Sequence, residues 1–208
     1  MGQGRGVAAR GVTATLLVIM LLAVDQTVKI WVKTHMTLHE SIPVFSWFRI
    51  MFIENNGMAY GMEFGSKLLL SVMRIGLIAV ICVIMASLVR KRAKWGFIIS
   101  VALVIAGAFG NIIDGMFYGM IFSESTPYTT AQLVDFGSGY ESFLKGRVVD
   151  MLYFPLIESH WPAWTPWVGG QELVFFAPVF NIADASITTG VALLLLFYRK
   201  EVANLTLR

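Results

Sequence analysis

Long apolar runs dominate this sequence and restrict it to a fold that spans a membrane. Four segments are long and apolar enough to cross a bilayer, at about residues 12–32, 68–89, 95–113 and 173–198. A spanning helix needs about 20 apolar residues, because it rises about 1.5 Å per residue through a hydrocarbon core about 30 Å thick. Hydrophobic residues make up 57% of the 208 and charged residues only 14%. We therefore expect an all-α membrane protein, a single membrane domain over residues 1–208 that forms a four-transmembrane-helix bundle.

The basic residues indicate how this bundle is oriented. They gather before the first segment, between the second and third, and after the fourth: Arg5, Arg10, Arg90, Lys91, Arg92, Lys94, Arg199, Lys200 and Arg208. All of these fall on one side of a four-span bundle, so the positive-inside rule predicts cytoplasmic termini and two outer loops, at about 33–67 and 115–171. The basic pI of about 9.1 therefore reflects topology and does not predict a nucleic-acid partner.

The outer loops carry two further signals. Residues 48–53 are β-branched and aromatic and precede an Asn-Asn-Gly turn, which predicts a short strand and a small extracytoplasmic β platform. The second loop contains Trp161, Trp164 and Trp167, and clustered tryptophans suit the headgroup layer, so we expect contact with membrane lipids.

Ionisable residues inside the apolar segments point to one site near the outer face. Helical rise counted from the inner ends places Asp25, Asp114 and Asp184 at heights of roughly 20, 29 and 22 Å. Asp150 lies within the second outer loop, just after its polar stretch, at the outer edge of the bundle. A charge within a span is costly and is a functional hypothesis by default. If Asp150 and Asp184 meet, they can share one proton and activate water.

Several neighbours have both functional and structural explanations. Asp25 and Lys29 are four residues apart on one helical face and can pair, which could be only an interfacial ion pair. Asn111 and Asn181 each stand three residues before an aspartate, where an amide can hold an acid in place. Asp114 could simply face water. Arg74 is expected to extend its charge to the membrane surface.

No metal site or cofactor is expected. The histidines His35, His39 and His160 have no spacing typical of zinc ligands, and Cys82, which lies within an apolar segment, is the only cysteine.

Five motifs in order resemble those of the lipoprotein signal peptidases, or signal peptidase II, the bacterial membrane aspartyl proteases. Asp25-Gln26-Thr27-Val28-Lys29 resembles D-Q-x-x-K, and Asn55-Asn56-Gly57-Met58-Ala59-Tyr60-Gly61 resembles N-x-G-x-A-F-G with Tyr for Phe. Gly107-Ala108-Phe109-Gly110-Asn111-Ile112-Ile113-Asp114 is similar to G-G-A-x-G-N-x-x-D. Val148-Val149-Asp150 is similar to V-V-D-F, and Phe180-Asn181-Ile182-Ala183-Asp184 to F-N-x-A-D.

The resemblance implies a catalytic dyad, Asp150 and Asp184. It implies a supporting or substrate-binding role for Asp25, Lys29, Asn55, Gly57, Asn111, Asp114 and Asn181. The implied substrate is a diacylglyceryl-prolipoprotein, cut on the amino side of its lipidated cysteine without metal or cofactor. The implied location is the bacterial cytoplasmic (inner) membrane, with the active site near the outer face and a monomeric enzyme.

The chain departs from the family pattern at two places. Gly115 stands where the family usually has Arg, and Arg147 is a candidate replacement. A segment over about Phe117–Leu144 separates Asp114 from Asp150, which the family keeps close, and its Gly-, Ser- and Thr-rich composition favours a mobile flap or partner-contact element. This insertion contains Leu133-Val134-Asp135-Phe136, a second match to V-V-D-F. We prefer Asp150, because Asp135 is followed by a polar Gly-Ser-Gly turn.

The alternative function is an ion- or proton-coupled small membrane carrier. A carrier is expected to place its acids near the midplane, with access from both faces. Here the acids gather toward one face. A scaffold protein would leave the polar residues unexplained.

Overall fold

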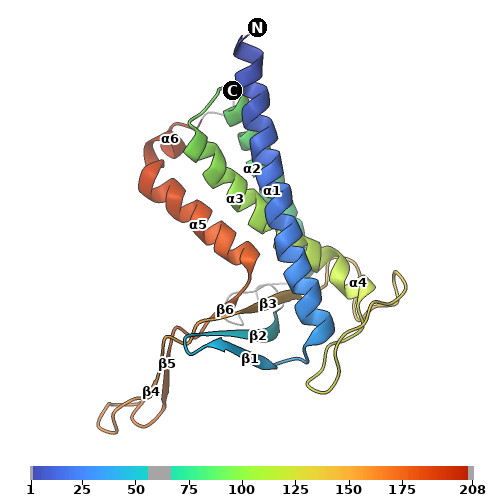
Figure 1. Cartoon of the computed structure of the whole chain (residues 1–208), viewed down its shortest axis with the longest axis vertical. Helices are drawn as coiled ribbons and strands as arrows, with labels where there is room; N and C mark the ends of the chain where they lie inside the picture. The colour runs from blue at the N-terminus through green and yellow to red at the C-terminus, as the bar shows by residue number, and fades with distance from the viewer. Residues whose placement is uncertain (1, 56–66, 206–208) are drawn as a thin grey trace.

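The computed structural model describes residues 2–55 and 67–205 and shows a helical bundle standing on a small sheet. The helices α1 (Gly2–His35), α2 (Lys67–Arg90), α3 (Trp95–Ile113) and α5 (Ile182–Phe197) form the bundle. Both chain ends lie at the end of the bundle away from the sheet (Figure 1). The predicted Gly57 lies outside the described residues.

Three of the four predicted spanning segments coincide with long helices, and the fourth is only partly helical. Within the described residues, three helices are long and apolar enough to cross a membrane, whereas α5 has only 16 residues. The predicted segment 173–198 was wrong in its first part, where β5 (Glu172–Phe175) and β6 (Val179–Phe180) are extended. Pro178 lies between these strands, and proline disfavours helix at the preceding residue. Short apolar runs do not distinguish strand from helix by periodicity.

The platform is larger than the single strand predicted, so the fold is not all-α. β1 (Ser41–Phe45), β2 (Phe48–Asn55), β3 (Val148–Tyr153) and β6 form one antiparallel sheet in the order β1-β2-β3-β6. β3 pairs with β2 and is thereby placed below the bundle, next to the N-terminal end of α5. A separate hairpin of β4 (Ile157–His160) and β5 extends sideways from this sheet (Figure 1).

Part of the insertion packs into the core. Helix α3 continues through a π-helical turn, η2 (Asp114–Tyr118), into the short α4 (Gly119–Ile121). Beyond them the chain packs back onto α1, β2 and β3 in a buried cluster: Val32, Met36, Phe52, Tyr118, Phe122, Ala131, Val149 and Met151. Other residues of the insertion, Tyr128, Leu133 and Phe136, are exposed, so the expectation of a mobile or partner-contact element stays a prediction.

Close contact between α3 and α5 brings the polar residues of the two helices together. Gly107 faces the backbone of α5, where a Cβ atom would overlap the carbonyl oxygen of Ala183 and the side chain of Ile187. Gly110 faces Asp25 and Ala183 in the same way. Small residues permit this approach between membrane helices.

Gly107→Ala is therefore expected to destabilise the protein by about 1–3 kcal/mol, because the added methyl group forces α5 away from α3. Thermal unfolding of the purified protein in detergent measures the change. The control is Gly76→Ala on α2, where a Cβ atom would meet nothing within 4 Å. Equal unfolding temperatures for the two variants would contradict this account of the α3–α5 contact.

Candidate active site

Asp150 lies on β3, buried beneath the bundle, with 2% of its surface exposed. Asn55 of the neighbouring strand donates a hydrogen bond from Nδ2 to Asp150 Oδ2 at 2.6 Å. Asn181 donates from its Nδ2 to the other carboxylate oxygen, also at 2.6 Å. Both oxygens of the carboxyl group are thus held by amides from elements on either side.

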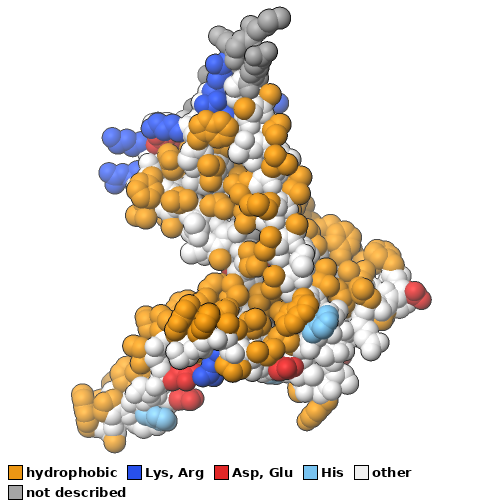
Figure 2. Space-filling model, viewed as in Figure 1, with side chains coloured by type: hydrophobic (Ala, Val, Ile, Leu, Met, Phe, Trp, Pro, Cys, Tyr) orange, Lys and Arg blue, Asp and Glu red, His pale blue; other side chains and the backbone are white. Residues whose placement is uncertain are grey.

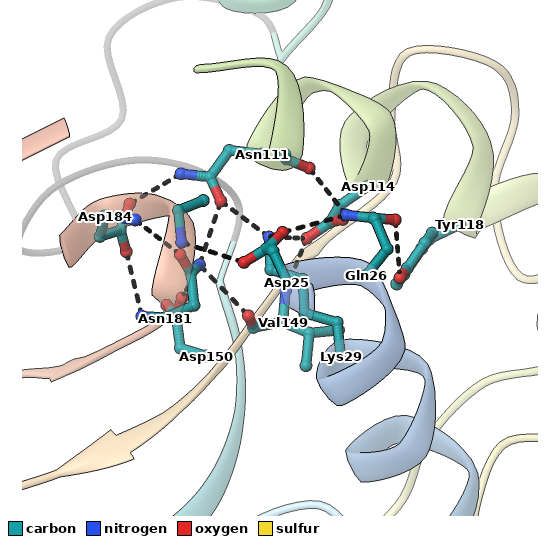
Figure 3. Close-up of polar contacts among 12 residues, drawn as sticks. Asp25, Gln26, Lys29, Asn111, Asp114, Tyr118, Val149, Asp150, Asn181 and Asp184 are labelled. Atoms are coloured by element: carbon teal, nitrogen blue, oxygen red, sulfur yellow. Dashed lines mark hydrogen bonds and ion pairs between the residues drawn. The ribbon is translucent and has the colours of Figure 1, made fainter. Parts of the chain in front are cut away.

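Asp184 lies in the first turn of α5 and is held by the same asparagine. Asn181 is the N-cap of this helix, and its Oδ1 accepts the N–H of Asp184 at 2.8 Å. Asp184 accepts the N–H of Asn181 in return at 3.4 Å, which completes a capping box. Asn111 of α3 donates its Nδ2 to Asp184 Oδ1 at 2.7 Å. Asn181 therefore contacts both acids, and Figure 3 shows the two acids on either side of it.

A buried lysine organises the residues behind this pair. Lys29 Nζ lies 3.1 Å from Asp25 Oδ2, 2.8 Å from Asp114 Oδ2 and 2.9 Å from Asn111 Oδ1. All three charged side chains are buried, so Asp114 does not face water. Asp25 also accepts the N–H of Ala183, next to Asp184, at 2.9 Å. Lys29, Asp25 and Asp114 thus position Asn111 and the first turn of α5 (Figure 3).

The environment of Asp150 favours its protonated form. Burial and, after it, the nearby charge of Asp184 raise the pKa of this carboxyl group to about 7, although the hydrogen bonds from Asn55 and Asn181 oppose the shift. Asp184 instead lies in the first turn of a helix, among backbone N–H groups. The two acids thus have different environments, as expected for a pair that divides acid and base roles.

The structure brings together eight of the predicted site residues: Asp25, Lys29, Asn55, Asn111, Asp114, Asp150, Asn181 and Asp184. Asn111 was expected beside Asp114 but donates to Asp184, across to the next helix. Asp135 is exposed in a turn of the insertion, apart from these residues. The expectation of no metal stays a prediction; within residues 2–55 and 67–205 no group of three or more His, Cys, Asp or Glu is placed to hold an ion.

The structure contains a second buried network, which was not predicted from the sequence. Lys33, one turn after Lys29, pairs with Glu54 and also donates to Ser125 at 3.0 Å. Arg147 lies 3.1 Å from Glu54 Oε2 and donates to the exposed Glu124. Arg147, the candidate replacement for the family arginine, thus binds Glu54. The helical spacing could have indicated Lys33, because it lies four residues after Lys29 and therefore on the same face of α1.

This network ties the insertion to the strands that hold the acids. The ring of Tyr140 lies between two cations, with Lys33 Nζ 4.9 Å and Arg147 Cζ 5.0 Å from its centroid. Glu54 directly precedes Asn55, whose amide binds Asp150. The position of Asn55 therefore depends on the neutralisation of Glu54 by Lys33 and Arg147.

A cavity of about 290 Å³ opens beside Asp184 between α2, α3 and α5. Three polar side chains line it, those of Arg74, Asn111 and Asp184. The rest of its lining is apolar: Leu77, Ile78, Ile81, Val104, Ala108 and Ile187. Arg74, expected to extend to the surface, lines this cavity. An apolar ligand can therefore approach the acids from the side of the bundle.

A buried acidic centre at one end of an apolar helical bundle defines a membrane-embedded protein with its site near one membrane face. A family model described as "Signal peptidase (SPase) II" matches residues 17–199. The lipoprotein signal peptidase of Porphyromonas gingivalis is 52% identical over 204 residues, covering 98% of this chain and 87% of the relative. That of Amoebophilus asiaticus is 34% identical over 197 residues, covering 89% and 77%. The chain belongs to the signal peptidase II family.

Solved structures share this fold. One described as "Bacterial membrane enzyme structure by the in meso method at 2.3 A resolution" has a TM-score of 0.61 and 23% identity, covering 93% of this chain and 92% of that one. Another of the same description, at 1.9 Å, has a TM-score of 0.58 and 24% identity over 88% and 90%. At these identities the likeness concerns the fold alone.

Glu54→Gln is expected to destabilise the protein by about 3–5 kcal/mol, because Lys33 then remains buried without its ion-pair partner. Glu124→Gln is the matched control: it also removes an acid that binds Arg147, but it is exposed, so its loss costs about 0–1 kcal/mol. Thermal unfolding in detergent compares the two. If both variants unfold at the wild-type temperature, the network does not stabilise the platform.

The stability of Asp150→Asn relative to wild type is expected to be higher at pH 8 than at pH 5. The folded-state pKa of Asp150, about 7, lies above its ordinary value of 3.8, so the folded protein binds this proton more tightly than the unfolded chain. Wild type therefore loses stability as pH rises toward and through 7, whereas the amide does not titrate. Unfolding temperatures at the two pH values test this, and an unchanged difference would contradict the raised pKa.

Proposed function

We propose that this chain is an aspartic endopeptidase that removes signal peptides from diacylglyceryl-modified prolipoproteins, with Asp150 and Asp184 as the catalytic pair. The observation that carries the proposal is Asn181, which contacts both acids at the outer end of the bundle. Its side chain donates to the carboxyl group of Asp150 and accepts the backbone N–H of Asp184, and its backbone N–H donates to the carboxyl group of Asp184. Family membership and relatives named lipoprotein signal peptidase support the substrate class.

The proposed mechanism gives the two acids different roles. Asp184, ionised at the helix N-terminus, takes a proton from a water molecule as that water attacks the scissile carbonyl carbon. Asp150, protonated, donates a hydrogen bond to the carbonyl oxygen as it becomes negative. When the tetrahedral intermediate collapses, the C–N bond breaks and the leaving amine takes up a proton from the pair. Asn55, Asn111 and Asn181 hold the carboxyl groups in place.

The proposed topology has four spans, with α5 as the fourth. On the face drawn in Figure 2, most Lys and Arg side chains lie at the end near the termini. That distribution supports cytoplasmic termini and an outer active site in a bacterial inner membrane. The cavity beside Asp184 offers lateral entry for the lipid-bearing substrate. We propose a monomer, as the family resemblance implies.

The carrier alternative finds no support in the bundle. The core of its inner half is apolar, with Phe97, Ile98, Val101, Ala102 and Ile105 buried between α1, α2 and α3. A carrier needs a polar path through that half.

Asp150→Asn and Asp184→Asn are each expected to abolish cleavage, because either amide removes the shared proton chemistry while keeping the side-chain volume. The expected loss is at least about 10³-fold, in the range seen when a paired catalytic group is removed. The measurement is cleavage of a lipidated prolipoprotein by purified protein in detergent. The control is Asp135→Asn, which changes an exposed aspartate and is expected to keep near-normal activity.

Two results would overturn the assignment. One is an active Asp150→Asn beside an inactive, folded Asp135→Asn. The other is loss of wild-type cleavage with EDTA and its recovery with zinc, which would indicate a metal-dependent hydrolase.

A further inference from the structure

The β4–β5 hairpin has two chemically different faces. Its register pairs Ile157 with Phe175 and Ser159 with Leu173, and directly paired residues point to the same face of a sheet. Ile157, Leu173 and Phe175 therefore share one face. The alternate residues lie on the opposite face, which is largely charged or polar: Glu158, His160, Glu172 and Val174.

The tip and base of the hairpin add to its apolar side. Trp164 and Trp167, in the turn that joins the strands, are 82% and 96% exposed. At the base, an aromatic ladder continues into the main sheet, with neighbouring ring centroids 4.8–6.2 Å apart: Phe45, Trp47, Phe48, Phe154, Phe176 and Phe180. In water such an uncovered surface would be costly, so a large exposed apolar patch indicates a partner.

The position of the hairpin identifies that partner as lipid. In Figure 2 the molecule is hollowed on one side between the bundle above and the hairpin arm below, and hydrophobic side chains line the arm toward this hollow. Acidic, basic and histidine side chains lie on the arm's other side. Helix α5 borders the same hollow (Figure 1), and most of its exposed side chains are apolar, among them Val191, Leu195, Leu196 and Phe197. The apolar face of the arm thus continues the surface that the spanning helices already present to lipid.

The length of α5 gives the depth of the arm. Its 16 residues rise about 24 Å, less than the about 30 Å of a bilayer core. Arg199 and Lys200 follow its inner end directly and mark the inner boundary there. The outer end of α5 therefore lies roughly 6 Å short of the outer boundary. The chain leading into it through β6 therefore crosses the last part of the outer leaflet, so the hairpin before β6 can lie at the level of the outer headgroups, where tryptophan is favoured.

We propose that the β4–β5 hairpin is an interfacial membrane-binding arm. Ile157, Leu173, Phe175 and the two exposed tryptophans enter the outer leaflet of the phospholipid bilayer. Glu158, His160 and Glu172 face the water, and Glu158 is braced by Arg49 of β2 at 3.3 Å. The arm fixes the height of the platform, which carries Asp150, relative to the membrane. This interaction does not depend on the proposed catalytic function.

Spin labels on the full-length protein in phospholipid nanodiscs test the proposal. In a Cys82→Ala background, Trp164→Cys or Trp167→Cys carries the label, one position at a time. Tyr128→Cys, in the outer insertion and 91% exposed, is the control position. At positions 164 and 167 we expect greater accessibility to oxygen, which concentrates in lipid, than to a water-soluble nickel chelate. The control position is expected to show the reverse.

A matched pair of charge substitutions tests the facing of the hairpin. Leu173→Asp places a charge on the apolar face and is expected to shift the label at position 164 from oxygen-accessible to chelate-accessible. Val174→Asp places the same charge one residue later, on the polar face, and leaves the label where it was, because only the first charge must enter lipid.

Three outcomes would overturn the proposal. Labels at 164 and 167 as accessible to the chelate as position 128 would place the arm in water. Labels shielded from both reagents would indicate contact with protein, such as a second copy of this chain. Equal effects of the two aspartates would contradict the assigned faces.

Discussion

The burial of Lys29 between two aspartates is the interaction on which the rest of the site depends. An uncompensated ammonium group in a membrane interior is costly, so Asp25 and Asp114 must both be present and close. Their pairing holds α1 against α3, and Asp25 also reaches the backbone at the start of α5. Once these helices are fixed, Asn111 and Asn181 have no freedom to turn away from the acids they bind.

The two carboxyl groups come from different kinds of structure, and this difference separates their chemistry. Asp150 lies on a strand, in a buried environment that raises its pKa to about 7. Asp184 lies in the first turn of a helix, where backbone N–H groups favour negative charge. One asparagine spans the gap between strand and helix. A sheet packed against the outer end of a bundle thus supports the division of acid and base roles that the proposed mechanism needs.

Outside the bundle, two outer segments support the platform from different sides. Part of the insertion packs against α1, β2 and β3, and Arg147 after it completes the Lys33–Glu54–Arg147 network, which explains why a polar-looking loop contains buried aromatic residues. The β4–β5 hairpin, a separate two-stranded sheet, extends from the platform in another direction and carries the exposed tryptophans. With the proposed arm in the headgroup layer, β3, which carries Asp150, is supported both by protein and by lipid.

The sequence by itself determined the membrane class, the first three spanning helices, the strand at residues 48–53 and the common height of Asp25, Asp114 and Asp184. Those features follow from local patterns: apolar runs long enough for a bilayer, β-branched alternation, and helical spacing that places polar residues at one height. The role of Asn55 was implied only by the family resemblance. Only the tertiary structure decided that α5 begins at Ile182 and that Asn111 donates its hydrogen bond to Asp184 and not to Asp114. It alone also decided that Lys33 and Arg147 both pair with Glu54. These depend on contacts between segments far apart in the chain, which are set by close packing such as that of Gly107 on α5. Residue patterns along the sequence do not indicate contacts between segments that are far apart in the chain.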